Sequence, residues 1–163
     1  FWFHHLRPNH WFGRNDFVDE ALRRRFGKEL IMLARRPAGE FLSDPETARA
    51  AVLLFDQVPR NLHRGQSNAF AIAKGAIARG WDKGLGKHER QFLTMPLMHS
   101  ESRADQRLSL RLYTELGDAS IRRFASSHAA MVLRFGRFPH RNAVLGRKST
   151  AAELRAVAAG NAW

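Results

Sequence analysis

Three short segments of the sequence collect side chains that could bind an anion or transfer a proton. The first segment, DQVPRNLHR, spans residues 56–64 and continues an apolar stretch. At 3.6 residues per helical turn, its polar side chains fall within an arc of about 140°. Asp56 and Arg60 could simply pair along a helix. An internal proline and two amides do not fit a plain ion-pair ladder, so the candidates here are Asp56, Gln57, Arg60, Asn61 and Arg64,.

The second segment is PLMHSESRADQR, residues 96–107. Ser100 or Ser102 can cap a helix that begins there, and acidic side chains suit the positive end of that helix. Capping does not explain the histidine after an apolar run, nor the second Asp-Gln pair. A histidine with a glutamate two positions later could act as acid and base. The candidates in this segment are His99, Ser100, Glu101, Asp105 and Gln106.

The third segment, RFGRFPHRN at residues 134–142, continues into AVLGRKST. Phe135 and Phe138 can anchor this loop to a core while its cations point elsewhere. Arginine-rich loops present forked donors that suit carboxylates and phosphates. The GRKS tetrapeptide lacks the glycine spacing and the preceding strand of a phosphate loop. The candidates are Arg137, His140, Arg141, Asn142 and Arg147, together with His128, which lies two helical turns before Gly136.

Helices must position these segments. Apolar spacing and capping residues predict helices over residues 16–33, 43–62, 67–79, from 87, 100–116 and 118–135, and a last short one after a Thr150–Glu153 capping box,. Ser43 or Asp44 can cap the helix over 43–62, with Glu46 closing a capping box,. Asp118 can cap the helix that follows it, and Gly136 is a typical left-handed stop,. Strand signals are absent. The pattern predicts an all-α domain of about seven helices in stacked antiparallel pairs. The basic helix 16–33 could lie on a membrane surface, but we expect its apolar stripe to face a core.

Composition sets further limits. The chain has 163 residues, which suggests one domain over residues 1–163, large enough to bury about 70% of its unfolded surface,. No apolar run reaches the roughly 18 residues of a membrane span. Because the sequence begins without methionine, we expect its natural start to be missing. It contains no cysteine, so it forms neither disulfides nor thiolate metal sites, which fits the cytoplasm,.

The charge is strongly positive, with 27 Lys and Arg against 15 Asp and Glu. Such a surface attracts polyanions and could hold nucleic acid loosely through phosphates. The basic doublets and triplets are scattered, however, and no known reading motif accompanies them,. We therefore do not expect sequence-specific nucleic-acid binding.

The three segments carry a family resemblance. LLFDQVPRNLHRG, LMHSESRADQ and RFGRFPHRNAVLGRKST, with FWF and HWFG near the start, resemble the bacterial family catalogued as domain of unknown function 924. The resemblance covers nearly the entire chain. It implies a tetratricopeptide-like helical superhelix, although the chain shows no 34-residue repeat of its own. It implies no particular activity. The family's recurrent polar positions match all the candidates above except His128.

Two features depart from the family pattern. The family usually carries a tryptophan shortly before the second long helix, where this chain has EFLSDPE. After NAFA the family continues with an acidic residue and further helical turns, whereas IAKGAIARG follows directly here. The stretch after Phe70 is therefore either truly deleted or missing from the sequence.

Three functions are compatible with these candidates. In the first, a cationic pocket binds an anionic small molecule or an acidic segment of a partner protein, with Arg60, Arg64, Arg137 and Arg141 as clamps. In the second, a hydrolase uses His99, His128 or His140 as base, Glu101 or Asp56 as its orienter and the arginines as charge stabilisers. In the third, the clusters form a buried polar network that only locks helices together. We expect no cofactor and no metal.

Overall fold

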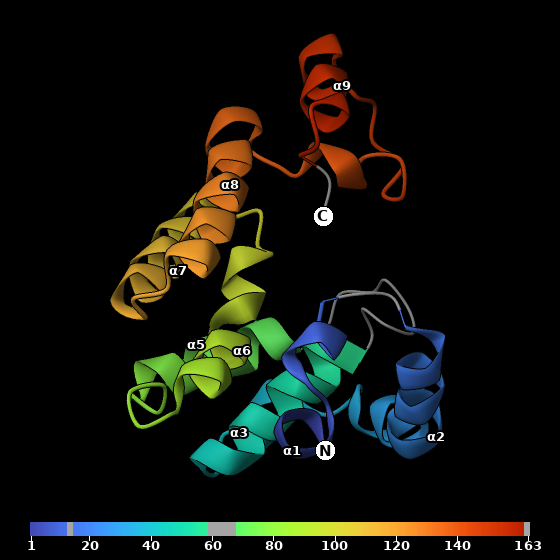
Figure 1. The fold of residues 1–163 in the computed structure, drawn as a ribbon, viewed down its shortest axis with the longest axis vertical. Helices are drawn as coiled ribbons and strands as arrows, with labels where there is room; N and C mark the ends of the chain where they lie inside the picture. The colour runs from blue at the N-terminus through green and yellow to red at the C-terminus, as the bar shows by residue number, and fades with distance from the viewer. Residues whose placement is uncertain (13–14, 59–67, 162–163) are drawn as a thin grey trace. The chain divides into compact units, whose positions relative to one another are not determined.

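The computed structural model describes residues 1–12, 15–58 and 68–161. These residues form eight α-helices and no strand, which confirms the predicted all-α class (Figure 1). They divide into two compact units, Phe1–Pro96 and Leu97–Trp163, which are described in turn. The single domain and the tetratricopeptide-like superhelix stay predictions. Within the described part of the chain, no helix has the length and apolar content needed to cross a membrane.

The first unit is built from five α-helices and short turns between them. In chain order these are α1 (Trp2–His5), the 3-10 turn η1 (Pro8–His10), α2 (Asp16–Leu33), the 3-10 turn η2 (Ala38–Phe41), α3 (Pro45–Val52), the π turn η3 (Leu53–Gln57), α5 (Ala69–Ala78) and α6 (Lys87–Met98), whose last two residues begin the second unit. The helix predicted over 43–62 thus changes its hydrogen-bonding pattern at Leu53, and residues 59–62 lie outside the described residues.

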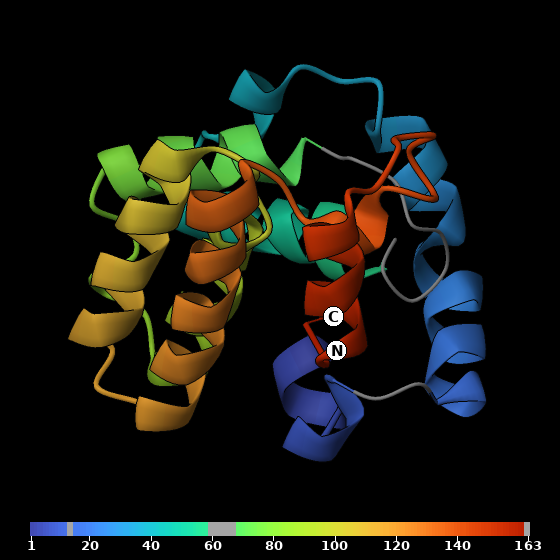
Figure 2. The same ribbon diagram turned by 90° about the horizontal axis from the view of Figure 1, so that it is seen from above.

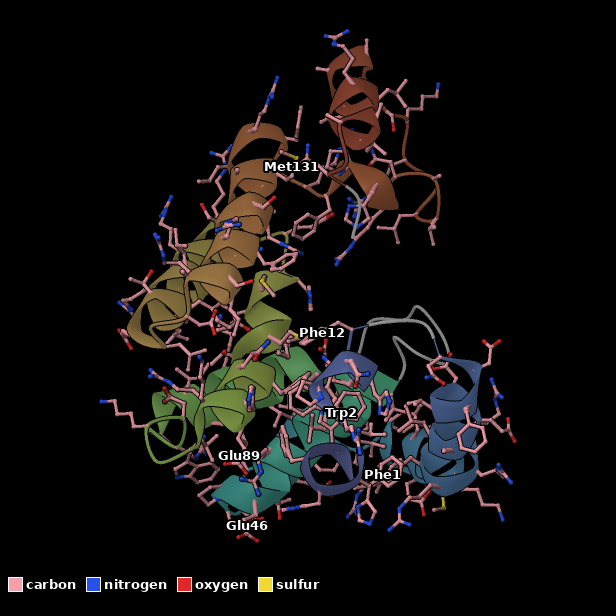
Figure 3. All side chains as sticks on the ribbon, viewed as in Figure 1. Phe1, Trp2, Phe12, Glu46, Glu89 and Met131 are labelled. Carbon is pink, nitrogen blue, oxygen red and sulfur yellow. The ribbon has the colours of Figure 1, made fainter. Side chains whose placement is uncertain are left out.

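Small residues let α3 and α5 pack closely in the first unit. Ala48, Ala73 and Ala76 are fully buried between them, with Val52 and Ile72 filling the remaining space. The predicted stripe of α2 also faces a core, since Val18 and Leu22 are buried and Leu30 and Leu33 pack against this apolar cluster. Aromatic rings pack around Phe92 of α6, among them Trp2 and Phe12, which are labelled in Figure 3.

The start of α3 shows why a helix forms there. Asp44 is the N-cap, and its carboxylate accepts hydrogen bonds from the Thr47 N–H at 2.8 Å and the Thr47 hydroxyl at 2.7 Å. These bonds, with one from the Ser43 hydroxyl, lower the pKa of Asp44 to about 2,. The prediction that Glu46 closes a capping box is wrong. Because Asp44 is the N-cap, the third helical position is Thr47 and not Glu46.

The second unit is a helical hairpin followed by a loop and a short helix. Its elements are α7 (Arg103–Glu115), α8 (Ala119–Phe135), the 3-10 turn η4 (Pro139–Arg141) and α9 (Ala151–Ala158). Helices α7 and α8 lie side by side in both views (Figures 1 and 2), and the three-residue connection between them makes them antiparallel. Met131, Val132 and Phe138 form an apolar cluster with Ala156.

The caps predicted for the second unit are confirmed. Asp118 accepts from the Ser120 and Ile121 N–H groups at the start of α8. Gly136 ends α8 in the left-handed conformation with φ 72°. Thr150 and Glu153 form the reciprocal capping box of α9. Of the two serines proposed for α7, Ser102 is the cap, and the helix begins at Arg103.

Candidate functional site

Two side chains hold three consecutive carbonyls at the end of α6. Gln106 Nε2 donates to the Met98 carbonyl at 2.8 Å and to the Ser100 carbonyl at 2.6 Å. Arg141 Nη1 donates to the His99 carbonyl between them at 3.0 Å. A helix end leaves carbonyls without intrahelical partners and carries partial negative charge. The amide and the guanidinium therefore satisfy this end, and they join the second polar segment to the third.

Ser100 organises the turn that leads into α7. Its hydroxyl donates to Asp105 Oδ2 at 2.9 Å, while Ser100 Oγ accepts the Ser102 N–H at 3.1 Å. Ser102 Oγ in turn accepts the Asp105 N–H at 3.4 Å. Asp105 is buried, so its carboxylate requires such hydrogen bonds,. Hydrogen bonds therefore hold four of the five candidates in this segment: His99, Ser100, Asp105 and Gln106.

Glu101 connects this turn to the loop after α8. Its carboxylate accepts the Phe138 N–H at 2.9 Å and pairs with Arg147, whose Nη1 lies 2.9 Å from Oε1 and 2.8 Å from Oε2. Partial burial raises the pKa of Glu101, but the hydrogen bonds from Arg147 and from the Phe138 N–H outweigh burial and lower the pKa below its usual range,. Glu101 is therefore ionised at neutral pH.

Arg137 binds a residue that sequence reasoning treated only as a helix cap. Its Nε and Nη2 lie 2.7 and 3.0 Å from the two oxygens of Glu153, and Nη2 also donates to the Lys148 carbonyl at 3.1 Å. The bond from Arg137, with the Thr150 N–H next in importance, lowers the pKa of the buried Glu153 to about 2. The same pair raises the pKa of Arg137. No local signal in the sequence links residues this far apart.

The three histidines of residues 97–163 are linked to Phe138 by a series of ring contacts. The rings of His128 and His140 lie 5.6 and 5.7 Å from that of Phe138, and the ring of His99 lies 5.8 Å from that of His128. The Arg141 guanidinium lies over the Phe138 ring at 4.6 Å. His128 Nδ1 lies 2.8 Å from the Phe124 carbonyl, and because a carbonyl only accepts, Nδ1 carries the proton,.

Asn142 is buried at the far side of the loop. Its Nδ2 lies 3.0 Å from Ser149 Oγ, and its backbone carbonyl accepts the Arg147 N–H at 2.8 Å. We name the whole cluster the polar centre. It comprises His99, Ser100, Glu101, Asp105, Gln106, His128, Arg137, His140, Arg141, Asn142, Arg147 and the additional Glu153. Two amide oxygens in it, Gln106 Oε1 and Asn142 Oδ1, are buried without a hydrogen-bond partner among the described residues.

The first polar segment belongs to the other unit. Asp56 and Gln57 are buried on the π turn, where Gln57 Nε2 lies 2.5 Å from Asp56 Oδ2 and 3.2 Å from the Met95 sulfur. The sequence did not reveal the π turn, a feature often found at functional sites,. Arg60, Asn61 and Arg64 lie outside the described residues. The structure thus brings the second and third segments together, and the meeting of all three stays a prediction.

The polar centre contains three arginines, three histidines and three carboxylates. Among the described residues, no three histidine or carboxylate side chains are arranged to hold a metal ion. Two of its carboxylates, Glu101 and Glu153, bind arginines. An all-helical protein with a polar centre that pairs arginines with carboxylates is the class that fold and site define.

Comparison with known proteins assigns the chain to a family. The family model described as bacterial protein of unknown function (DUF924) matches residues 1–161, so the chain belongs to this family. A solved structure, that of the protein of unknown function ATU0120 from Agrobacterium tumefaciens, is 34% identical to it. The similarity covers 92% of this chain and 89% of that one, with a TM-score of 0.84. No curated protein matches the chain.

Proposed function

We propose that the chain is a binding protein whose polar centre holds an anionic small molecule that also carries a hydroxyl or amine group. One observation carries this proposal: Gln106 Oε1 is fully buried and lacks a hydrogen-bond partner among the described residues. The orientation of the Gln106 amide is fixed, because Nε2 donates to two carbonyls. A flipped amide would place Oε1, which only accepts, against these two acceptors,. Buried polar atoms left without partners are rare in native proteins, and a ligand is one explanation for them.

The hydrogen-bond donors around Phe138 support an anion. Arg141 binds the carbonyl between the two that Gln106 holds. The imidazoles of His128 and His140 lie against its stacking partner Phe138, and a third imidazole, that of His99, lies against His128. A carboxylate or phosphate group would bind to such donors by charge-assisted hydrogen bonds. A hydroxyl or amine on the same molecule would donate to Gln106 Oε1. The ligand class is therefore a hydroxylated or aminated carboxylate or phosphate.

The arginines take different roles in this proposal. Arg137 and Arg147 each bind a carboxylate of the same unit, so they position the loop after α8 rather than clamp the ligand. Arg141 contributes charge directly. Asp56, Gln57, Arg60, Asn61 and Arg64 stay proposed contributors from the first segment. An acidic segment of a partner protein is the corresponding macromolecular ligand, and a cytoplasmic location stays part of the proposal.

A hydrolase is the second candidate, favoured by the three histidines. His99 and His140 are half-buried, so either imidazole could exchange protons with a bound substrate,. Glu101 is not the base in this scheme, since Arg147 and the Phe138 N–H keep it ionised and occupied. The third candidate, a purely structural network, is supported by the carbonyls that Gln106 and Arg141 hold.

Thermal melting against matched anion pairs tests the proposal. Citrate and glycerol 3-phosphate carry hydroxyl groups, whereas tricarballylate and inorganic phosphate lack the alcohol. We expect the hydroxylated member of a pair to raise the melting temperature in a saturable way that persists at high salt. A ligand at a hundredfold excess over its Kd stabilises a protein by about 2.7 kcal/mol, which is easily measured.

Two variants distinguish the outcomes. Arg141→Gln removes the proposed anion donor, and Arg155→Gln removes an exposed arginine of α9 as a matched control. We expect the ligand-induced increment to vanish in the first and to persist in the second. Equal losses in both would assign the effect to overall charge. No increment from any compound would overturn the binding proposal in favour of the structural network. Turnover that is lost with His99→Gln or His140→Gln would favour the hydrolase.

A further inference from the structure

Three arginines line one exposed face of α7. Arg103, Arg107 and Arg111 follow each other at intervals of four residues, and all three are exposed. At a rise of 1.5 Å per residue, successive side chains stand about 6 Å apart along the helix. Figure 3 shows nitrogen-tipped side chains projecting outward from α7 and α8. We call these three residues the arginine stripe.

Unlike the paired arginines of α2, the stripe has a single exposed carboxylate on its own helix, Glu115, which lies four residues after Arg111. On α2, Glu20 pairs with both Arg23 and Arg24, and near the end of that helix Arg36 pairs with Glu40. Within the described part of the chain, no ion pair involves a member of the stripe. The only hydrogen bond that we find there for these side chains is from Arg103 Nη2 to the Leu133 carbonyl at 3.3 Å.

This arrangement works against the stability of α7. Like charges four residues apart on a helix repel each other, and the stripe contains two such pairs. Arg103 is also the first residue of α7, where the helix dipole favours acidic side chains,. An exposed surface that departs from local stability rules in this way is typical of a functional surface. A polyanion that neutralised the stripe would relieve both unfavourable effects.

We infer that the arginine stripe binds the phosphate backbone of a nucleic-acid duplex without reading its sequence. Guanidinium groups fit phosphates through two parallel hydrogen bonds. The exposed positions of α7 are Arg103, Ala104, Arg107, Arg111, Thr114 and Glu115. They include no aromatic ring, which single-strand binding uses as a stacking platform. They include no large apolar side chain, which an amphipathic helix needs to enter a membrane surface. The inference is independent of the ligand proposed for the polar centre.

Titration of a fluorescent 20-base-pair duplex at several salt concentrations tests this inference. The test variant is Arg103→Gln/Arg107→Gln/Arg111→Gln in the full chain. The matched control is Arg23→Gln/Arg24→Gln/Arg25→Gln, which removes the same number of exposed charges from α2. Each phosphate contact contributes about −0.9 to the slope of log K against log salt. We expect the stripe variant to lose about 2.7 of that slope and to bind about tenfold more weakly or worse at 0.1 M salt. The control should stay within about twofold of the parent chain.

The outcomes are distinguishable. Because Arg103 also bonds to α8, the double variant Arg107→Gln/Arg111→Gln, compared with Arg23→Gln/Arg24→Gln, repeats the test with that bond intact. Equal weakening of stripe and control variants would mean that net charge alone binds the duplex, and would overturn the inference. Absence of duplex binding at 50 mM salt would also overturn it. The inference would also be overturned if the binding of poly-glutamate, of a single strand or of vesicles with anionic headgroups depended on the stripe to the same extent as duplex binding.

Discussion

Arg137 and Glu153 bind each other through two parallel hydrogen bonds, Nε to Oε1 at 2.7 Å and Nη2 to Oε2 at 3.0 Å. The same carboxylate accepts the Thr150 N–H at 2.7 Å and so also closes the capping box of α9. One glutamate therefore fixes both the start of a helix and the loop that leaves α8. This pairing explains why Arg137 follows the left-handed Gly136 so closely.

The first prediction concerns the dependence of stability on pH. Contacts in the folded state lower the pKa of Glu153 from 4.5 to about 2, so folding favours its ionised form. The resulting stability is fully present above pH 4.5 and is lost as the pH falls through the folded value near 2,. We expect the free energy of unfolding of Glu153→Gln to depend less on pH across this window than that of the parent. Urea titrations between pH 2 and 7 measure the difference.

Asp44 provides the control for this experiment. Its pKa also falls to about 2, from bonds at the start of α3. Asp44→Asn should therefore flatten the same pH range independently, and the double variant should combine both effects. An unchanged pH dependence in Glu153→Gln would contradict the assigned role of the Arg137 pair.

The second prediction concerns Gln106. Replacing it with alanine leaves the Met98 and Ser100 carbonyls without their donor in a buried site. Each unsatisfied buried group costs about 1–3 kcal/mol, so we expect Gln106→Ala to lose about 2–5 kcal/mol of unfolding free energy. Arg107→Ala, at the next and exposed position, should change it by less than about 0.5 kcal/mol,. Chemical denaturation provides the measurement, and a loss below about 1 kcal/mol for Gln106→Ala would contradict the prediction.

The third prediction concerns Gly136. Its φ of 72° lies in the left-handed region, where a side chain is disfavoured, and open space surrounds the position of an added Cβ. We expect Gly136→Ala to cost about 1–2 kcal/mol from backbone conformation alone. Gly39 also faces open space but is not among the positive-φ glycines. Gly39→Ala should therefore be neutral or stabilise the chain by up to about 1 kcal/mol, as thermal melts of both variants would show.

The fourth prediction concerns the cap of α9. Thr150 Oγ1 accepts the Glu153 N–H at 3.2 Å, and Thr150→Ala should cost about 1 kcal/mol through loss of this bond,. Thr114→Ala is the matched control, because that hydroxyl donates only to the Leu110 carbonyl on an exposed helix face. It should change stability by less than about 0.5 kcal/mol. Equal effects would show that the capping box does not stabilise α9.

Local chemistry made much of the fold predictable. Asp118, Gly136 and the Thr150–Glu153 pair act on backbone groups within a few residues of themselves, so their spacing alone identified the helix ends. The π turn at Leu53 was missed, because a widened helical turn has no apolar period or cap of its own,. The sequence identified both segments of the polar centre as polar clusters that could line a site.

The pairing within the polar centre could not be predicted in the same way. Arg137 looked available for an anion, whereas it binds Glu153 at a separation of 16 residues. Gln106 and Arg141 were identified as site residues, but the carbonyls that they hold are backbone atoms, which no residue type marks. Only the packed geometry of the α6 end, α7 and η4 shows which donor meets which acceptor.

The bonds of Glu101 also determine when this unit can form during protein synthesis. Its two partners, Phe138 and Arg147, stand 37 and 46 residues further along the chain. A ribosome releases the N-terminal end first, so a nascent chain carries Glu101 into water well before either donor has been made. Contacts of such long sequence separation also form late in folding, because the loop must close before they contribute. The hairpin of α7 and α8 can therefore form early, while the centre that joins it to the following loop closes only after Arg147 has been made.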